Sequence, residues 1–177
     1  LWKYIPEKPL AAFGCDTING CSPLIVNFTD SSDANCDDIK SYQWNFNDPS
    51  SGANNTSTSS SPSHTFNTPG VFTVTLIVTN CMGAMDSAVK SITVLSSPVI
   101  TTSPNPSLCV GSIATLTVSG ASTYSWLPAT GLSSTSGSSV TVSATAPITY
   151  TVIGSNANGC STNSVIAISV FSIPVAN

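Results

Sequence analysis

The main pattern along the chain is an alternation of apolar and polar residues within short segments. It is clearest in residues 72–79, where Phe72, Val74, Leu76 and Val78 alternate with positions that are mostly threonine. A period of two places successive side chains on opposite faces of a strand, so one face is apolar and the other meets solvent. No segment sustains the 3.6-residue period of an amphipathic helix. We therefore predict a chain built from short strands.

The strand pattern occurs twice in the same order. Residues 42–44 align with residues 124–126, residues 72–80 with 148–156, and residues 91–94 with 167–170. The aligned segments are separated by turns rich in Gly, Pro, Asn and Ser, which is typical of β-sandwiches. The sequence thus predicts an all-β protein with two tandem β-sandwich domains, over residues 13–96 and 97–172.

Proline-marked segments lie beside these units, at Pro9, Pro98 and Pro174. We expect residues 1–12 to be a linker or the end of a preceding domain, and residues 173–177 to begin a further domain. Ordinary frayed termini are the alternative at both ends.

The charge distribution excludes several function classes. The chain has 4 Lys, no Arg and 8 Asp or Glu, for a net charge of −4, and every charge lies between Lys3 and Lys90. A nucleic-acid partner is excluded because four scattered lysines cannot form the basic surface that it needs. Membrane insertion is excluded because polar residues interrupt every apolar run well short of about 18 residues.

Four stretches of the first half form a recognisable set: Val26–Ser32, Tyr42–Asp48, His64–Phe66 and Thr68–Asn80. Through them, residues 13–95 resemble a PKD (polycystic kidney disease) domain of the immunoglobulin-like type. One departure is that the W-D-F-G-D-G motif of this family reads Trp44-Asn-Phe-Asn-Asp-Pro49 here.

Three shorter stretches mark the second half: Cys109–Gly111, Tyr124–Pro128 and Asn158–Cys160. Through them, residues 98–171 resemble the Ig-like, PKD-like modules of large bacterial surface adhesins and type IX-secreted proteins. Both resemblances imply adhesion, spacing or binding rather than catalysis.

Six cysteines in a chain rich in Ser and Thr indicate an oxidising compartment. In an Ig-like topology, Cys36 in the B–C loop and Cys81 in the F–G turn lie at the same end, so we expect them to form a disulfide. Cys15 and Cys21 both flank the A–B turn and form the second expected pair. Parity favours a Cys109–Cys160 bond, but their positions at opposite ends oppose it, because bridged Cα atoms lie within about 7 Å. Bonds to neighbouring domains are the alternative.

The acidic stretch that contains Asp30, Asp33, Asp37 and Asp38 is a candidate Ca²⁺ site. Carboxylate oxygens on a loop suit calcium, and the resemblance strengthens the expectation because some PKD domains bind it. The alternative is a solvated strand connection. We expect no other cofactor.

Five aromatic residues are expected in the cores: Tyr42, Trp44, Phe46, Tyr124 and Trp126. The first three share one face of a strand, and a tryptophan at this place in a sandwich usually packs between the sheets. A sugar-stacking platform is the alternative.

Catalysis is not expected. His64 is predicted to be a structural strand residue, because the chain has no G-x-S-x-G turn to hold a nucleophile. The second half has no acid, base or histidine for proton transfer. Thr17 and Ser87 fit the Asp-Ser/Thr-apolar pattern of bacterial O-glycosylation.

We therefore predict a non-catalytic, secreted or cell-surface segment of a bacterial surface protein, serving as a stalk or filament-forming array of β-sandwiches. Its expected partners are neighbouring domains or copies of the same chain, with surface polysaccharide as a further candidate. The alternative is an accessory carbohydrate-binding module of a secreted polysaccharide hydrolase, which would use Trp2 and Tyr4 as exposed aromatics.

Overall fold

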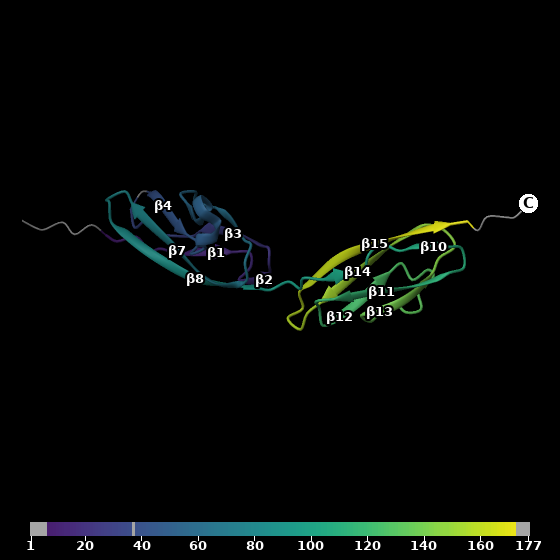
Figure 1. The fold of residues 1–177 in the computed structure, drawn as a ribbon. Coiled ribbons are helices and arrows are strands. Elements are labelled where there is room, and N and C mark those ends of the chain that lie inside the picture. The colour runs from purple at the N-terminus through teal and green to yellow at the C-terminus, as the bar shows by residue number, and fades with distance from the viewer. Residues whose placement is uncertain (1–6, 37, 173–177) are drawn as a thin grey trace, which may run out of the picture. The chain divides into compact units, whose positions relative to one another are not determined.

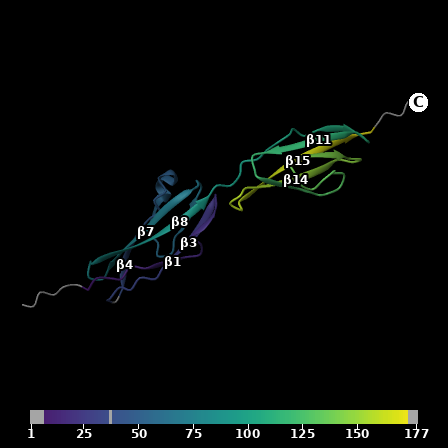
Figure 2. The same cartoon turned by 90° about the horizontal axis from the view of Figure 1, so that it is seen from below.

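The computed structural model describes residues 7–36 and 38–172 of the chain. Contacts within the chain divide it into two compact units, Leu1–Ser96 and Ser97–Asn177, which we call the first and second domains. The regular secondary structure of each consists almost entirely of strands (Figures 1 and 2), so the all-β prediction of two tandem sandwiches is confirmed. Within the described residues, no helix is long and apolar enough to cross a bilayer.

The first domain has two sheets, with strand orders β1-β3-β6 and β2-β8-β7-β4-β5. A short 3-10 helix, η1 (Pro49–Asn55), connects β4 to β5. The strands are β1 (Phe13–Cys15), β2 (Asn19–Cys21), β3 (Leu24–Asp30), β4 (Ile39–Asn45), β5 (Thr56–Ser57), β6 (Ser63–Phe66), β7 (Gly70–Asn80) and β8 (Met85–Leu95).

The core of the first domain follows the alternating pattern. Side chains that point inward from β7 are fully buried, whereas the threonines between them lie outside the core. They pack against aromatic side chains of the facing strands. The buried core residues are Phe13, Val26, Phe28, Trp44, Phe46, Phe66, Phe72, Val74, Leu76, Val78, Ile92 and Val94.

The second domain repeats this plan with sheets β13-β11-β9 and β10-β15-β14-β12. Its core is separate and is centred on Leu116, Trp126, Tyr150, Val152 and Ile166. The strands are β9 (Thr101–Thr102), β10 (Ser107–Cys109), β11 (Ile113–Ser119), β12 (Thr123–Leu127), β13 (Ser139–Ser143), β14 (Ile148–Ser155) and β15 (Ser161–Phe171).

Two pairings recur in both domains. A long antiparallel hairpin forms the centre of the larger sheet, from β7 and β8 in the first domain and from β14 and β15 in the second. Its turn contains a glycine with positive φ, Gly83 at 76° and Gly159 at 82°, a conformation that glycine adopts without steric cost. The last strand also pairs in parallel with a short early strand, β8 with β2 and β15 with β10.

Candidate functional site

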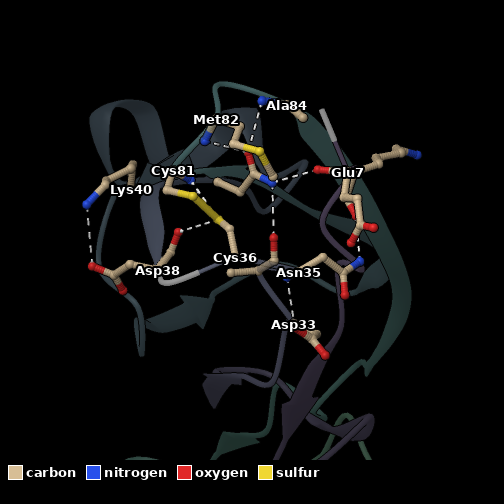
Figure 3. Close-up of a disulfide and its surroundings, with 12 residues drawn as sticks. Glu7, Asp33, Asn35, Cys36, Asp38, Lys40, Cys81, Met82 and Ala84 are labelled. Carbon is tan, nitrogen blue, oxygen red and sulfur yellow. Dashed lines mark hydrogen bonds and ion pairs between the residues drawn. A yellow bond between two sulfur atoms is a disulfide. The ribbon is translucent and has the colours of Figure 1, made fainter. Parts of the chain in front are cut away.

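One end of the first domain holds the predicted disulfide (Figure 3). Cys36, in the loop after β3, is bonded to Cys81, in the turn after β7, with 6.4 Å between their Cα atoms. The amide of Cys81 also donates to the carbonyl of Asp38, at 3.0 Å. The bond closes a segment of 45 residues, which removes conformational freedom from the unfolded chain.

Asn80 is the polar centre of this end and is 1% exposed. Its Nδ2 donates to the carbonyls of Glu7 at 2.8 Å and Ala34 at 3.0 Å. Its Oδ1 accepts from the amides of Met82 at 3.1 Å and Ala84 at 3.0 Å. One side chain therefore joins the N-terminal segment, the loop after β3 and the β7–β8 turn (Figure 3). We call the Cys36–Cys81 bond and Asn80 with its partners the disulfide end.

The N-terminal segment is also attached to β8 through Asp86. This carboxylate forms an ion pair with Lys8 and accepts a hydrogen bond from the amide of Ala11, at 2.9 Å. The hydrogen bond from Lys8 and the amide of Ala11 lower the pKa of Asp86 to about 2. The sequence gives no local sign of this role of Asp86, because its partners lie about 75 residues earlier.

Two residues of the proposed calcium set cap short turns. Asp30 accepts from the amide and hydroxyl of Ser32, at 3.1 and 2.6 Å, and Asp33 accepts from the amide of Asn35, at 2.9 Å. Such local bonds are the ordinary role of aspartate in a strand connection.

Of the remaining two residues of the set, only Asp38 is described, and it does not join Asp30 and Asp33 as a third ligand. Asp38 is exposed and lies 3.7 Å from the ammonium of Lys40, and Asp37 lies outside the described residues. Within residues 7–36 and 38–172, no three His, Cys, Asp or Glu side chains are grouped so that they could hold a metal ion. The calcium site stays a prediction.

A buried polar pair lies elsewhere in the first domain. The Nε2 of His64 is 3.1 Å from the Oδ2 of Asp48, and both side chains are almost fully buried. The imidazole stacks on Phe46 at 4.3 Å between ring centroids and meets the ring of Phe66 edge-on. His64 is thus a structural strand residue that holds the Asp48 loop against the core.

The Asp48 carboxylate is held in its ionised form. Burial raises its pKa, but hydrogen bonds from Ser50 and His64 outweigh this effect, so the pKa lies below its ordinary value. The hydroxyl of Ser50 donates to Asp48. A carboxylate with a lowered pKa is a weak proton acceptor, so the bond from Ser50 stabilises the loop.

The expected Cys15–Cys21 disulfide is wrong, because Cys15 carries a free thiol. Cys15 ends β1 opposite Phe28 of β3, whereas Cys21 ends β2 opposite Leu95 of β8. The two strands belong to different sheets, so proximity in sequence does not bring the sulfurs together.

Cys109 and Cys160 do not form a disulfide, which settles the pairing that the sequence left open. Cys109 is exposed and free, whereas Cys160 is buried. Cys109 lies beside the last residue of β15 and Cys160 directly precedes its first residue. The topological objection therefore holds.

The five aromatic residues lie at the two cores. Trp44, Phe46 and Trp126 are 1–2% exposed, while Tyr42 and Tyr124 are half-buried at the core edges. The described tryptophans therefore cannot stack on a sugar.

The glycosylation positions, the two N-terminal aromatic residues and the C-terminal segment remain predictions. Thr17 is half-buried, and its hydroxyl donates to the carbonyl of Asn19 at 2.7 Å, whereas Ser87 is exposed on β8. Neither observation tests their glycosylation. Trp2 and Tyr4 lie outside the described residues, as do the residues 173–177 expected to begin a further domain.

Comparison with known families matches the PKD domain to residues 6–94 and an Ig-like domain, described as CHU_C associated, to residues 96–174. Both are non-catalytic modules, and no enzyme family matches. A comparison with curated proteins finds no match.

Solved structures include similar domains. The PKD1 domain of the Vibrio cholerae metalloprotease PrtV is 30% identical, with 50% of this chain and 98% of that chain covered and a TM-score of 0.41. The PKD1 domain of Vibrio anguillarum Epp is 28% identical, with 50% and 94% covered and a TM-score of 0.41. A structure described as carbohydrate-binding modules of the β-sandwich superfamily is 21% identical, with 84% and 55% covered and a TM-score of 0.47.

Proposed function

Because the chain belongs to the PKD-domain family over residues 6–94 and continues in an Ig-like domain over residues 96–174, we propose that it is an extracellular structural segment of a bacterial surface protein. In this role its β-sandwiches form part of a stalk or filament that carries tension and resists proteolysis. PKD and Ig-like domains with disulfides are typical of extracellular proteins, which supports the location.

The observation that carries the proposal is the parallel pairing of an early strand with the last strand in each domain. β2 pairs with β8, and β10 pairs with β15. Tension that reaches such a pair from opposite ends of the domain slides the two strands past one another. Their hydrogen bonds then resist together, whereas an antiparallel hairpin pulled at its open end would lose its bonds one at a time.

The disulfide end supports the same role in the first domain. The Cys36–Cys81 bond and the four hydrogen bonds of Asn80 join segments that are far apart in sequence. A covalent bond at this end limits how far the domain can extend after its strands separate. It also keeps the loops closed against proteases, which cut locally opened segments.

Force spectroscopy of the full chain tests the mechanical role. The amide of Val110 donates to the carbonyl of Phe171 at 3.0 Å, and Val110→Pro removes this donor whereas Val110→Ala keeps it. We expect Val110→Pro to lower the unfolding force of the second domain while Val110→Ala preserves it. Equal unfolding forces in the two variants would contradict the mechanical role of the β10–β15 pair.

The cell-surface location has its own test. Protease added to intact cells of the source organism should degrade the protein, as followed with an antibody against this chain. A protein that stays protected until the cells are lysed would contradict the proposed location.

We extend the proposal to partners, which would be neighbouring domains or copies of the same chain. Residues 91–177 contain no charged side chain, so no long-range repulsion keeps such surfaces apart. Sedimentation of the full chain should show association that survives high salt. A monomer at millimolar concentration in both low and high salt would mark the second domain as a passive spacer.

A further inference from the structure

Cys21 and Cys109 occupy equivalent positions in the two domains. Cys21 ends β2 and lies opposite Leu95, the last residue of β8. Cys109 ends β10 and lies opposite Phe171, the last residue of β15. In both domains the cysteine therefore lies beside the point where the chain leaves its last strand (Figure 1 labels the four strands).

The backbone hydrogen bonds around the two cysteines correspond one to one. In each domain, an amide of the last strand donates to the carbonyl three residues before the cysteine, and the amide after the cysteine donates back to the last strand. The bonds are Thr93 N to Ile18 O (2.8 Å) and Ser22 N to Leu95 O (2.8 Å) in the first domain, and Ser169 N to Pro106 O (3.1 Å) and Val110 N to Phe171 O (3.0 Å) in the second.

The two equivalent cysteines differ in oxidation state. Cys21 is disulfide-bonded, whereas Cys109 is an exposed free thiol. The other cysteine of the second domain, Cys160, cannot reach Cys109. It lies at the opposite end of β15, an 11-residue strand with a rise of about 3.3 Å per residue, and bridged Cα atoms lie within about 7 Å.

We propose that Cys109 is the attachment point of a disulfide to a cysteine of another β-sandwich module. This inference rests on the proposed extracellular function, because only an oxidising compartment maintains such a bond. Cys109 is exposed and lies beside the last residue of β15, so a neighbouring module can reach its sulfur. The bonded state of Cys21 at the equivalent place supports a disulfide at this position of the fold.

The bond forms by thiol–disulfide exchange with an oxidant that is itself a disulfide, such as a dithiol–disulfide oxidase. The thiolate of Cys109 attacks the oxidant and forms a mixed disulfide, which releases one thiol of the oxidant. The thiolate of the partner cysteine then attacks the sulfur of Cys109 and releases the second thiol. Two protein thiols become one disulfide, and the oxidant takes up two electrons and two protons.

Non-reducing peptide mapping of the protein from its natural source tests the proposal. Acid quenching and digestion with pepsin keep thiol exchange slow, and no lysine or arginine is needed for cleavage. We expect the Cys109 peptide to be linked to a cysteine peptide of another module. The size of the protein on non-reducing gels then distinguishes a module of the same polypeptide from one on a second copy.

Three mapping results would overturn the proposal: an alkylated Cys109, a Cys109 that carries only a small thiol, or a bond to Cys160 of the same domain. The Cys36–Cys81 bond serves as the internal control. If it is intact while Cys109 is free, the inference fails and the proposed function stands. If both are reduced in the native protein, the proposed extracellular function fails as well.

Matched variants of the 177-residue chain test the position itself. Treated with oxidised glutathione at high protein concentration, the chain should form a covalent dimer through its accessible thiol. Cys109→Ser should reduce this dimer at least tenfold, and Cys15→Ser should leave it unchanged, because Cys15 packs against the first core. Dimer that persists in Cys109→Ser or disappears in Cys15→Ser would contradict the assignment of Cys109 as the linking residue.

Discussion

The first domain contains all twelve charged side chains of the chain, and the second contains none. The first uses carboxylates: Asp48 is hydrogen-bonded to His64 in the core, and Asp86 forms an ion pair with the exposed Lys8. The second uses neutral hydroxyls, such as that of Tyr150, which donates to the carbonyl of Thr130. Two domains with the same arrangement of strands are therefore stabilised by different kinds of polar interaction.

The bonds that the two domains share are neutral bonds from side chains to the backbone. The indole of Trp44 donates to the carbonyl of Ser59 at 2.8 Å, and that of Trp126 to the carbonyl of Gly137 at 2.9 Å. Asn80 and Asn156 each accept from the amides two and four residues later. These neutral bonds are common to both domains, and the interactions of carboxylates are added in the first domain alone. The stability of the first domain should therefore depend on pH, and that of the second should not.

The largest difference between the domains should come from the Cys36–Cys81 bond. The double substitution Cys36→Ser, Cys81→Ser should destabilise the first domain by about 2–5 kcal/mol, because the unfolded chain regains the freedom of a long loop. Hydrogen exchange measured by mass spectrometry would resolve the two domains. Protection of the second domain should be unchanged, and Cys109→Ser should affect neither domain. Unchanged protection in the first domain would show that the disulfide adds no stability.

The next largest losses of stability should come from substituting Asn80 and Asn156. Asn80→Ala should destabilise the first domain by about 2–3 kcal/mol, because two carbonyls and two amides lose a buried partner. Asn156→Ala should destabilise only the second domain. Gln43→Ala, at an exposed position of β4, is the control and should stay within about 0.5 kcal/mol. If either substitution changed the stability of the other domain, the two asparagines would not have equivalent roles.

Lowering the pH should produce a smaller difference in stability between the two domains. The pKa of Asp86 is about 2 in the folded state and 3.8 in the reference state, and that of Asp48 is also lowered. Lowered pKa values stabilise the fold above pH 3.8, and this contribution is lost as the pH falls through about 2. Melting curves between pH 7 and pH 2 should show the first domain weakening while the second stays constant. Asp86→Asn should reduce the difference, and parallel loss in both domains would refute it.

The smallest effect should come from the exposed Asp38–Lys40 pair. Lys40→Ala should change the stability of the first domain by no more than about 0.5 kcal/mol, because surface ion pairs are weak and screened by salt. Chemical denaturation at low and high salt measures this. A larger loss at low salt would indicate that Lys40 offsets repulsion within the acidic stretch.

Local patterns were sufficient to predict the strands and cores. The alternation through Phe72, Val74, Leu76 and Val78 defines the buried face of β7 because burial in a strand follows its two-residue period. The repeat also aligned Asn80 with Asn156, but their shared role was missed. The signal was available, since each asparagine is followed three residues later by a glycine, Gly83 or Gly159.

Partners that are distant in sequence could not be predicted in this way. His64 is on a predicted strand, but its contact with Asp48 depends on how the loop after β4 folds back over the core. That loop departs from the family motif, so the resemblance gave no guide. Cys15 and Cys21 illustrate the opposite error, because six residues of separation place them on strands of different sheets.

His64 is the only histidine of the chain, and its imidazole stacks on Phe46 and meets Phe66 edge-on. Ring currents from these two neighbours should move its proton resonances away from those of a free imidazole. A one-dimensional NMR spectrum therefore contains a single, assigned reporter for the first core, with no isotope label and no mutation. Unfolding of the first domain can be followed at this one signal in the purified chain.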